Sequence, residues 1–183
     1  MKKIVLIIFV LFLFASGCIQ SSPEVTEKQG EVLVGKYSNT GFTMSYPQSW
    51  NVVNQTVGDY EVVFSSPDGQ ASVGIMIDSW YHPEGAEEGD FGISNELPNS
   101  TPIESREKIR ISGVDGFKWT FLVNDGNREY IHGTNMFVQK CPELQNNRIL
   151  YYIDYDYSKG NIQMEKTVNA MLDSIGMTCP SNK

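Results

Sequence analysis

The stretch Arg148-Ile149-Leu150-Tyr151-Tyr152-Ile153-Asp154-Tyr155-Asp156-Tyr157 gives the clearest indication of the fold. Side chains alternate between the two faces of a strand, so this stretch places large apolar side chains on one face and the two aspartates on the other. The apolar face consists of Ile149, Tyr151, Ile153 and Tyr155. This pattern predicts a strand that packs on a core with one side only.

A helix is predicted directly after this strand, over residues 161–175. Its apolar residues recur at helical spacing and form one stripe: Met164, Val168, Met171, Leu172 and Ile175. Gly176 follows, where a left-handed residue commonly ends a helix. A half-buried strand followed by an amphipathic helix predicts an α+β domain, an antiparallel sheet flanked by helices.

The rest of the chain predicts mainly strands. Phe42 to Tyr46 alternates and is stopped by Pro47, and Trp50 is expected to pack on the core shortly afterwards. Turn residues between apolar runs predict two hairpins. The remaining expected strands are 60–66 and 71–78 in the first hairpin, 104–111 and 116–123 in the second, and 128–139. Residues 80–102 show little periodicity and are expected to form a long loop.

The N-terminus carries an export signal. Lys2 and Lys3 precede an apolar run, and Ala15-Ser16-Gly17-Cys18 is similar to the lipobox of a lipoprotein. The run is too short for a spanning helix, which needs about 20 residues. The alternatives are an ordinary secretory signal or an uncleaved anchor. We expect a signal peptide over 1–17, a lipid-carrying (palmitate) Cys18 with a flexible tether over 18–35, a folded domain over 36–179 and a tail over 180–183.

Two segments resemble the PsbP-like proteins. One is Tyr37-Ser38-Asn39-Thr40-Gly41-Phe42-Thr43-Met44-Ser45-Tyr46-Pro47-Gln48-Ser49-Trp50, and the other is Leu150-Tyr151-Tyr152-Ile153-Asp154-Tyr155 with the helix ending Met171-Leu172-Asp173-Ser174-Ile175. The resemblance covers roughly residues 36–177 at the accuracy of sequence-based boundaries. It implies a Mog1/PsbP-like fold, an α/β/α sandwich around an antiparallel sheet. Its motifs are structural, so it implies no catalytic residue.

Two cysteines remain once Cys18 is assigned to lipid. Cys141 and Cys179 are expected to form a disulfide, because export delivers the chain to an oxidising compartment. A catalytic cysteine is the alternative, but no partner motif accompanies either residue. The formal net charge of −8 repels phosphate backbones, so we expect no nucleic-acid partner.

Candidate ligand-binding residues gather in the long loop. Its carboxylates could hold a weak calcium site, although acidic loops are usually only solvated; they are Glu84, Glu87, Glu88 and Asp90. Its aromatic residues could contact a partner protein or pack beneath the loop; they are Trp80, Tyr81 and Phe91.

Other candidates are scattered along the chain. A metal site or triad would need His82 and His132 to converge with carboxylates, and two unrelated histidines are the simpler interpretation. Asp154 and Asp156 could form a carboxylate pair of the hydrolase type, with two exposed acids as the ordinary alternative. Asn54 and Asn99 begin glycosylation sequons.

These observations favour a lipid-anchored domain on the extracytoplasmic face of the cell membrane. We expect a non-enzymatic binding or assembly module for another envelope protein, with no cofactor. The alternative is a lipoprotein that binds a small ligand or a cation such as Ca²⁺ in a cleft beside the long loop.

Overall fold

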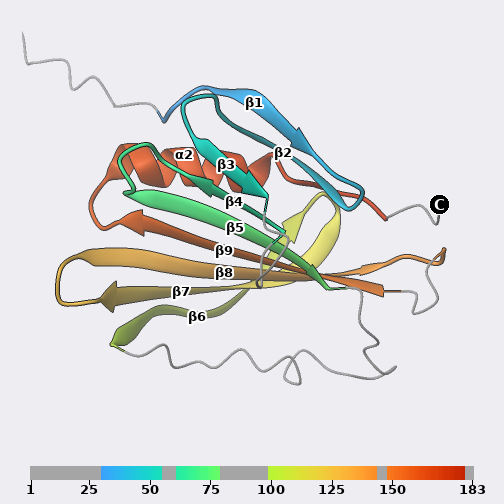
Figure 1. The fold of residues 1–183 in the computed structure, drawn as a ribbon. Coiled ribbons are helices and arrows are strands. Elements are labelled where there is room, and N and C mark those ends of the chain that lie inside the picture. The colour runs from blue at the N-terminus through green and yellow to red at the C-terminus, as the bar shows by residue number, and fades with distance from the viewer. Residues whose placement is uncertain (1–29, 55–60, 79–98, 144–147, 180–183) are drawn as a thin grey trace, which may run out of the picture.

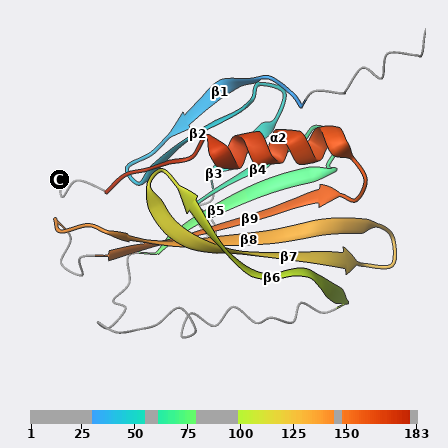
Figure 2. The same ribbon diagram turned by 180° about the vertical axis from the view of Figure 1, so that it is seen from behind.

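The computed structural model describes residues 30–54, 61–78, 99–143 and 148–179. Most of these residues form an antiparallel sheet of seven strands, which curls around a single helix (Figures 1 and 2). In spatial order its strands are β3 (Asn51–Asn54), β4 (Val62–Ser65), β5 (Ala71–Asp78), β9 (Arg148–Ser158), β8 (Glu129–Lys140), β7 (Val114–Asn124) and β6 (Ser100–Ile111).

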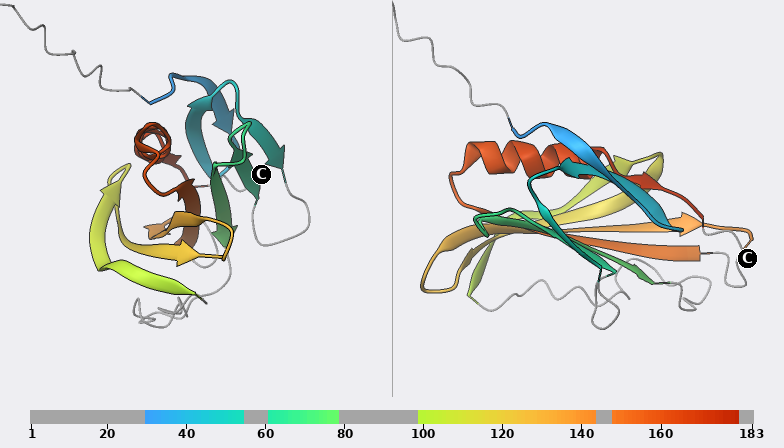
Figure 3. Two further views of the ribbon diagram at one scale, coloured as in Figure 1. Left: turned by 90° about the vertical axis from the view of Figure 1, so that its left-hand side faces the viewer. Right: turned by 45° about the horizontal axis from the view of Figure 1, so that its top comes forward.

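The helix and a small second sheet occupy the concave face. Helix α2 (Ile162–Asp173) contacts β9, β5 and β2. The second sheet has the order β1-β2-β10, with β1 (Leu33–Ser38), β2 (Phe42–Pro47) and β10 (Gly176–Met177). Seen from the end, β6 and β7 rise on one side of the helix and the small sheet on the other (Figure 3). The curled sheet therefore encloses α2 from both sides.

The expected α/β/α sandwich is wrong. Within the described ranges the chain contains one helix, so the convex face of the large sheet carries no helix there. The apolar stripe of α2 is buried against the concave face, as its spacing predicts, and no second amphipathic helix covers the other face. The described part of the chain is mostly antiparallel sheet, with one helix on one side.

Local predictions from the sequence agree better with the structure. Both hairpins are confirmed, because β4 pairs with β5 and β6 pairs with β7 in antiparallel register. Trp50 is buried, as expected. The helix starts after Asn161, whose side-chain oxygen accepts a hydrogen bond from the Met164 N–H and caps the first turn.

Two boundaries differ from the sequence expectations. The folded domain begins before residue 36, because β1 starts at Leu33 and the Glu31 N–H donates to the buried Thr167 hydroxyl of α2 at 2.8 Å. Gly176 is not left-handed and does not end the helix. It lies in β10, where a Cβ atom would meet Thr43 Oγ1, so a close strand contact explains this glycine.

Two separate groups of buried side chains stabilise the fold. The larger group lies between the sheet, α2 and the small sheet, and it includes Phe42, Phe64, Tyr151 and Val168. The smaller group lies on the convex face and comprises Phe117, Trp119, Phe121, Val123, Met136 and Leu150. Strands β7, β8 and β9 are therefore apolar on both faces along part of their length, unlike a strand with one solvated face.

Candidate functional site

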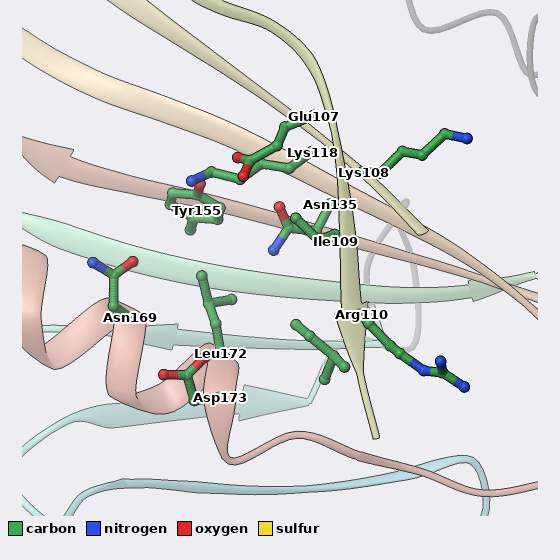
Figure 4. A pocket seen from close by; sticks show the side chains of 11 residues that line it. Glu107, Lys108, Ile109, Arg110, Lys118, Asn135, Tyr155, Asn169, Leu172 and Asp173 are labelled. Atoms are coloured by element: carbon green, nitrogen blue, oxygen red, sulfur yellow. The ribbon is translucent and has the colours of Figure 1, made fainter. Parts of the chain in front are cut away.

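A pocket of about 570 Å³ lies on the concave face, between the C-terminal half of α2 and the β6–β7 hairpin (Figure 4). We call it the concave pocket. The strand register aligns Glu107 of β6 with Lys118 of β7, and Lys118 with Asn135 of β8. These three residues form a polar row across the sheet, here called the concave row, and all three line the pocket.

The same row becomes apolar further along the sheet. Asn135 is aligned with Ile153, which is aligned with Ile75 and then with Val62. These three side chains are at most 1% exposed and belong to the main core. The pocket therefore begins where the row changes from core residues to polar ones.

Glycines on both sides of the concave row shape the floor of the pocket. A Cβ atom at Gly133 would overlap the Tyr155 ring, and one at Gly116 would overlap the Phe137 ring. Each aromatic ring therefore lies over the glycine that is aligned with it on the adjacent strand. Asn135 belongs to the row between these two glycine–aromatic pairs. Aromatic side chains commonly cover cross-strand glycines in this way.

The Asn135 side chain is buried without a partner for its acceptor atom. The residue is 2% exposed, and Asn135 Oδ1 accepts no hydrogen bond. The hydroxyl of Thr120, on the same face of the adjacent β7, is likewise buried and unpaired. Each such group costs about 1–3 kcal/mol of folding stability. Figure 4 shows Asn135 directed into the pocket. Its Oδ1 atom is covered by neighbouring side chains, so a ligand with a hydrogen-bond donor would displace part of that cover to reach it.

The walls of the pocket add both charges and apolar surface. Lys118 is half-buried, and its side-chain ammonium forms no ion pair or hydrogen bond with another described residue. Asn169 and Asp173 approach from α2, while Lys108 and Arg110 of β6 point away from the pocket (Figure 4). The apolar surface comes from Ile109, Ile111 and Leu172.

The hairpin that forms one wall is fixed at its tip. Ser112 and Gly113 have φ values of 51° and 79° and form a two-residue turn between β6 and β7. The Ser112 hydroxyl donates to the Ile175 carbonyl, just after α2, at 2.5 Å. The hairpin and the helix end are therefore held together beside the pocket.

A second polar row crosses the convex face of the same strands. Ser72 of β5 is aligned with Asp156 of β9, which is aligned with His132 of β8. We call these three residues the convex row. His132 Nδ1 lies 2.8 Å from Asp156 Oδ1, and the Ser72 hydroxyl donates to Asp156 Oδ2 at 3.4 Å. Asp154 on the same strand accepts a hydrogen bond from the Thr134 hydroxyl. Both aspartates are half-buried and hydrogen-bonded, so the interpretation as two exposed acids is wrong.

The charges around His132 favour its protonated form. Burial has the largest single influence and lowers the pKa of His132, but the hydrogen bond and charge of Asp156, with the charge of Asp154, outweigh it. The net pKa is raised above the usual 6.5. His132 is thus a hydrogen-bonded partner of Asp156. His82 lies outside the described residues, so the interpretation of two unrelated histidines stays a prediction.

The convex row resembles a catalytic triad only in residue types. Thr134 Oγ1 lies 3.4 Å from His132 Nε2, but its hydroxyl donates to Asp154 Oδ1 at 2.6 Å. A nucleophile must give its proton to the histidine, and this hydroxyl gives it to a carboxylate instead. In the part of the chain that the structure describes, no group of three or more His, Cys, Asp or Glu residues could hold a metal ion.

The remaining sequence predictions divide into three groups. The disulfide between Cys141 and Cys179 is confirmed, with the two Cα atoms 5.5 Å apart. Asn54 and Asn99 are both exposed, so glycosylation stays a prediction. Other predicted residues lie outside the described ranges: Cys18, Trp80, Tyr81, His82, Glu84, Glu87, Glu88, Asp90 and Phe91.

Comparisons with known proteins find likeness in structure alone. No family model matches the sequence, and no curated protein matches it. LpqN, a protein involved in cell envelope biogenesis of Mycobacterium tuberculosis, superposes with a TM-score of 0.60 at 9% identity, over 79% of this chain and 90% of LpqN. A protein from Bacteroides thetaiotaomicron gives a TM-score of 0.53 at 15% identity, over 82% of this chain and 49% of its own length.

This likeness shows a shared fold and does not confirm membership of the PsbP-like family. The chain spans about half of the Bacteroides protein. Among the described residues, no helix is long and apolar enough to cross a membrane.

Sequence reasoning missed the residues of the concave pocket. Asn135 offered a signal, because it falls on the inward face of its strand, between Gly133 and Phe137. A polar residue among core positions is unusual unless it has a partner or a function. Lys118 and Glu107 gave no such signal, because only the long-range register places them beside Asn135.

Proposed function

We propose that this protein is a lipid-anchored, non-enzymatic binding module of the cell envelope, and that the concave pocket is its binding site. The observation that carries the proposal is the buried, unpartnered Asn135 Oδ1 at the pocket floor. A buried acceptor without a donor is costly for stability alone, and a ligand that donates a hydrogen bond would offset that cost.

The location rests on two lines of support. Cys18 follows a short apolar run and small residues, as in lipoprotein signals. The fold is shared with LpqN, which takes part in cell envelope biogenesis. We also propose that it supports another envelope protein, and the involvement of LpqN in cell envelope biogenesis is compatible with such a role.

The binding role is supported by how the polar groups are distributed. The pocket combines a few convergent polar groups with an apolar wall, as small-molecule sites do. The histidine–aspartate pair, the strongest candidate for acid–base chemistry, lies on the opposite face of the sheet. A substrate in the pocket would be out of its reach, which favours binding over catalysis.

The binding site can be tested by nuclear magnetic resonance on the mature chain. A mixture of small polar compounds should shift the side-chain amide signals of Asn135 and the backbone signals of Lys118. The signals of His132, on the convex face, serve as the internal control and should stay in place. Shifts confined to the convex face, or absent throughout, would contradict the proposal.

The anchor is tested separately by membrane fractionation. Cys18→Ser removes the thiol that would carry the lipid and should release the protein from the membrane. Ser21→Ala alters the neighbouring tether without touching the thiol, so this control should remain in the membrane fraction. Retention of the Cys18→Ser variant would show that the lipid is not the anchor.

A further inference from the structure

We infer that the concave pocket binds a small zwitterion with an apolar side chain, an α-amino acid or short peptide whose ammonium and carboxylate ends are both free. This inference rests on the proposed binding function and names the class of ligand. It depends on three features of the pocket: an unpaired acceptor at the floor, opposite charges on facing walls, and an apolar surface between them.

The floor requires a hydrogen-bond donor. Asn135 Oδ1 is buried and accepts no hydrogen bond, and an amide oxygen can only accept. The ligand must therefore present an N–H or O–H group to Asn135. An ammonium group has three such donors, so it can satisfy Asn135 and still bond to a carboxylate nearby.

The sheet side of the pocket supplies the positive charge of Lys118, beside the negative charge of Glu107, its neighbour in the strand register. Lys118 lies directly opposite Asn135 in the antiparallel register, which places their Cβ atoms about 5 Å apart. The Lys118 ammonium forms no ion pair with another described residue. A ligand carboxylate beside Asn135 would give this charge a partner.

The helix side supplies the opposite charge. Asp173, the last residue of α2, lines the pocket on the helix side with an exposed carboxylate (Figure 4). Lys108 and Arg110 do not neutralise the pocket, because both point away from it. An anion alone would face the carboxylates of Asp173 and Glu107, and a cation alone would face Lys118, whereas a zwitterion complements charges of both signs.

The apolar wall indicates the rest of the ligand. Ile109 and Ile111 of β6 and Leu172 of α2 line the pocket together. Burying an aliphatic side chain against them would add roughly 1.5–3 kcal/mol of favourable transfer free energy. A volume of about 570 Å³ lies within the usual range for small-molecule sites.

The test is a titration of the full mature chain with L-leucyl-L-leucine, in which binding is measured from the nuclear magnetic resonance signals of the Asn135 side-chain amide. A parallel titration with L-leucine decides whether the ligand is a free amino acid or a peptide. N-acetyl-L-leucyl-L-leucine and L-leucyl-L-leucine amide each remove one end charge. Each blocked peptide should bind about tenfold or more weakly than the free dipeptide, because one charged hydrogen bond is lost.

The Lys118→Met variant removes the charge and keeps most of the side-chain volume. It should weaken binding of the free dipeptide about tenfold and leave binding of the amide within about twofold, because the amide has no carboxylate for Lys118. Lys108→Met is the matched control, since Lys108 is a neighbour that points away from the pocket. It should change neither affinity.

Three outcomes overturn the inference. If Lys118→Met weakens the binding of the dipeptide and of its amide equally, Lys118 does not bind the ligand carboxylate. If N-acetyl-L-leucine amide, which has no charged end, shifts Asn135 more strongly than the dipeptide, the pocket binds ligands of another class and the proposed function stands. If none of these probes or the wider mixture shifts Asn135, the zwitterion and the binding function fail together.

Discussion

The concave row and the convex row cross the same strands of one sheet, and they differ in whether their polar groups have partners. On the convex side, the Asp156 carboxylate is bonded to both Ser72 and His132. On the concave side, Asn135 Oδ1 accepts nothing, and Lys118 has no ion pair with a described residue. A paired polar row stabilises the fold, whereas a buried acceptor without a donor, such as Asn135 Oδ1, lowers stability and is available to a ligand.

This contrast explains why residue types alone point to the wrong face. The convex row has the composition of a catalytic site, a histidine with hydroxyl and carboxylate neighbours, yet its hydrogen bonds are already satisfied internally. The concave row has an ordinary composition and an unsatisfied acceptor. Partners, more than residue types, distinguish the two faces, and substitutions of the polar residues in the two rows should therefore have opposite effects on stability.

The largest effect is expected for Gly133→Ala, beside the concave row. The new Cβ atom would overlap the Tyr155 ring, and that ring cannot move freely because Tyr155 is 2% exposed. Overpacking of this kind costs about 1–3 kcal/mol, and we expect the upper end. Urea unfolding measures this loss in the free energy of unfolding. Gly113→Ala, at a turn with open space around it, tests backbone strain without overpacking.

The next effect is expected on the convex face. His132→Ala leaves the half-buried Asp156 carboxylate without its charged partner, and we expect a loss of about 2 kcal/mol in the free energy of unfolding. Urea unfolding of His132→Ala, of Asp156→Asn and of the double variant gives the interaction energy between the two side chains. Additive losses would show that His132 and Asp156 do not stabilise each other.

On the concave face the sign should reverse. Asn135→Leu replaces the unpaired amide with an apolar side chain of similar size, so we expect a gain of about 1 kcal/mol in the free energy of unfolding. Binding in the concave pocket should be lost at the same time. Thr120→Val, which removes the other unpaired group from this face, should also stabilise the fold.

The smallest effect is a dependence of stability on pH that arises from the convex row. The pKa of His132 is raised in the folded state, so the contribution of its charged form is fully present below the unfolded pKa of about 6.5. That contribution is lost as the pH rises through the folded pKa. Unfolding measured from pH 5.5 to 8.5 should show falling stability for the wild type and a flatter profile for Asp156→Asn.

The sequence predicted the local elements of the fold far better than their arrangement in layers. The alternation of Arg148 to Tyr157 and the helical spacing of Met164, Val168 and Met171 are local patterns, and both elements form where expected. The α/β/α sandwich required knowledge of what covers each face of the sheet, which depends on long-range packing. The inference of a second helical layer came from a resemblance and was wrong.

The candidate site depended on long-range order more than the fold did. Glu107, Lys118 and Asn135 are adjacent only because two strand pairings have this register, and a shift of one residue would turn each side chain to the other face. The Cys141–Cys179 bridge was predictable, since it needed only the number of cysteines and the expectation that the chain is exported.

The most direct test of the account combines the stability and the binding of Asn135→Leu in one series of urea unfolding curves, with and without L-leucyl-L-leucine. We expect the variant to be more stable than the wild type without the dipeptide. The dipeptide should stabilise the wild type and leave the variant unchanged, because ligand binding adds stability only to a state that binds it. A variant that is less stable than the wild type and still responds to the dipeptide would contradict the assignment of the concave pocket.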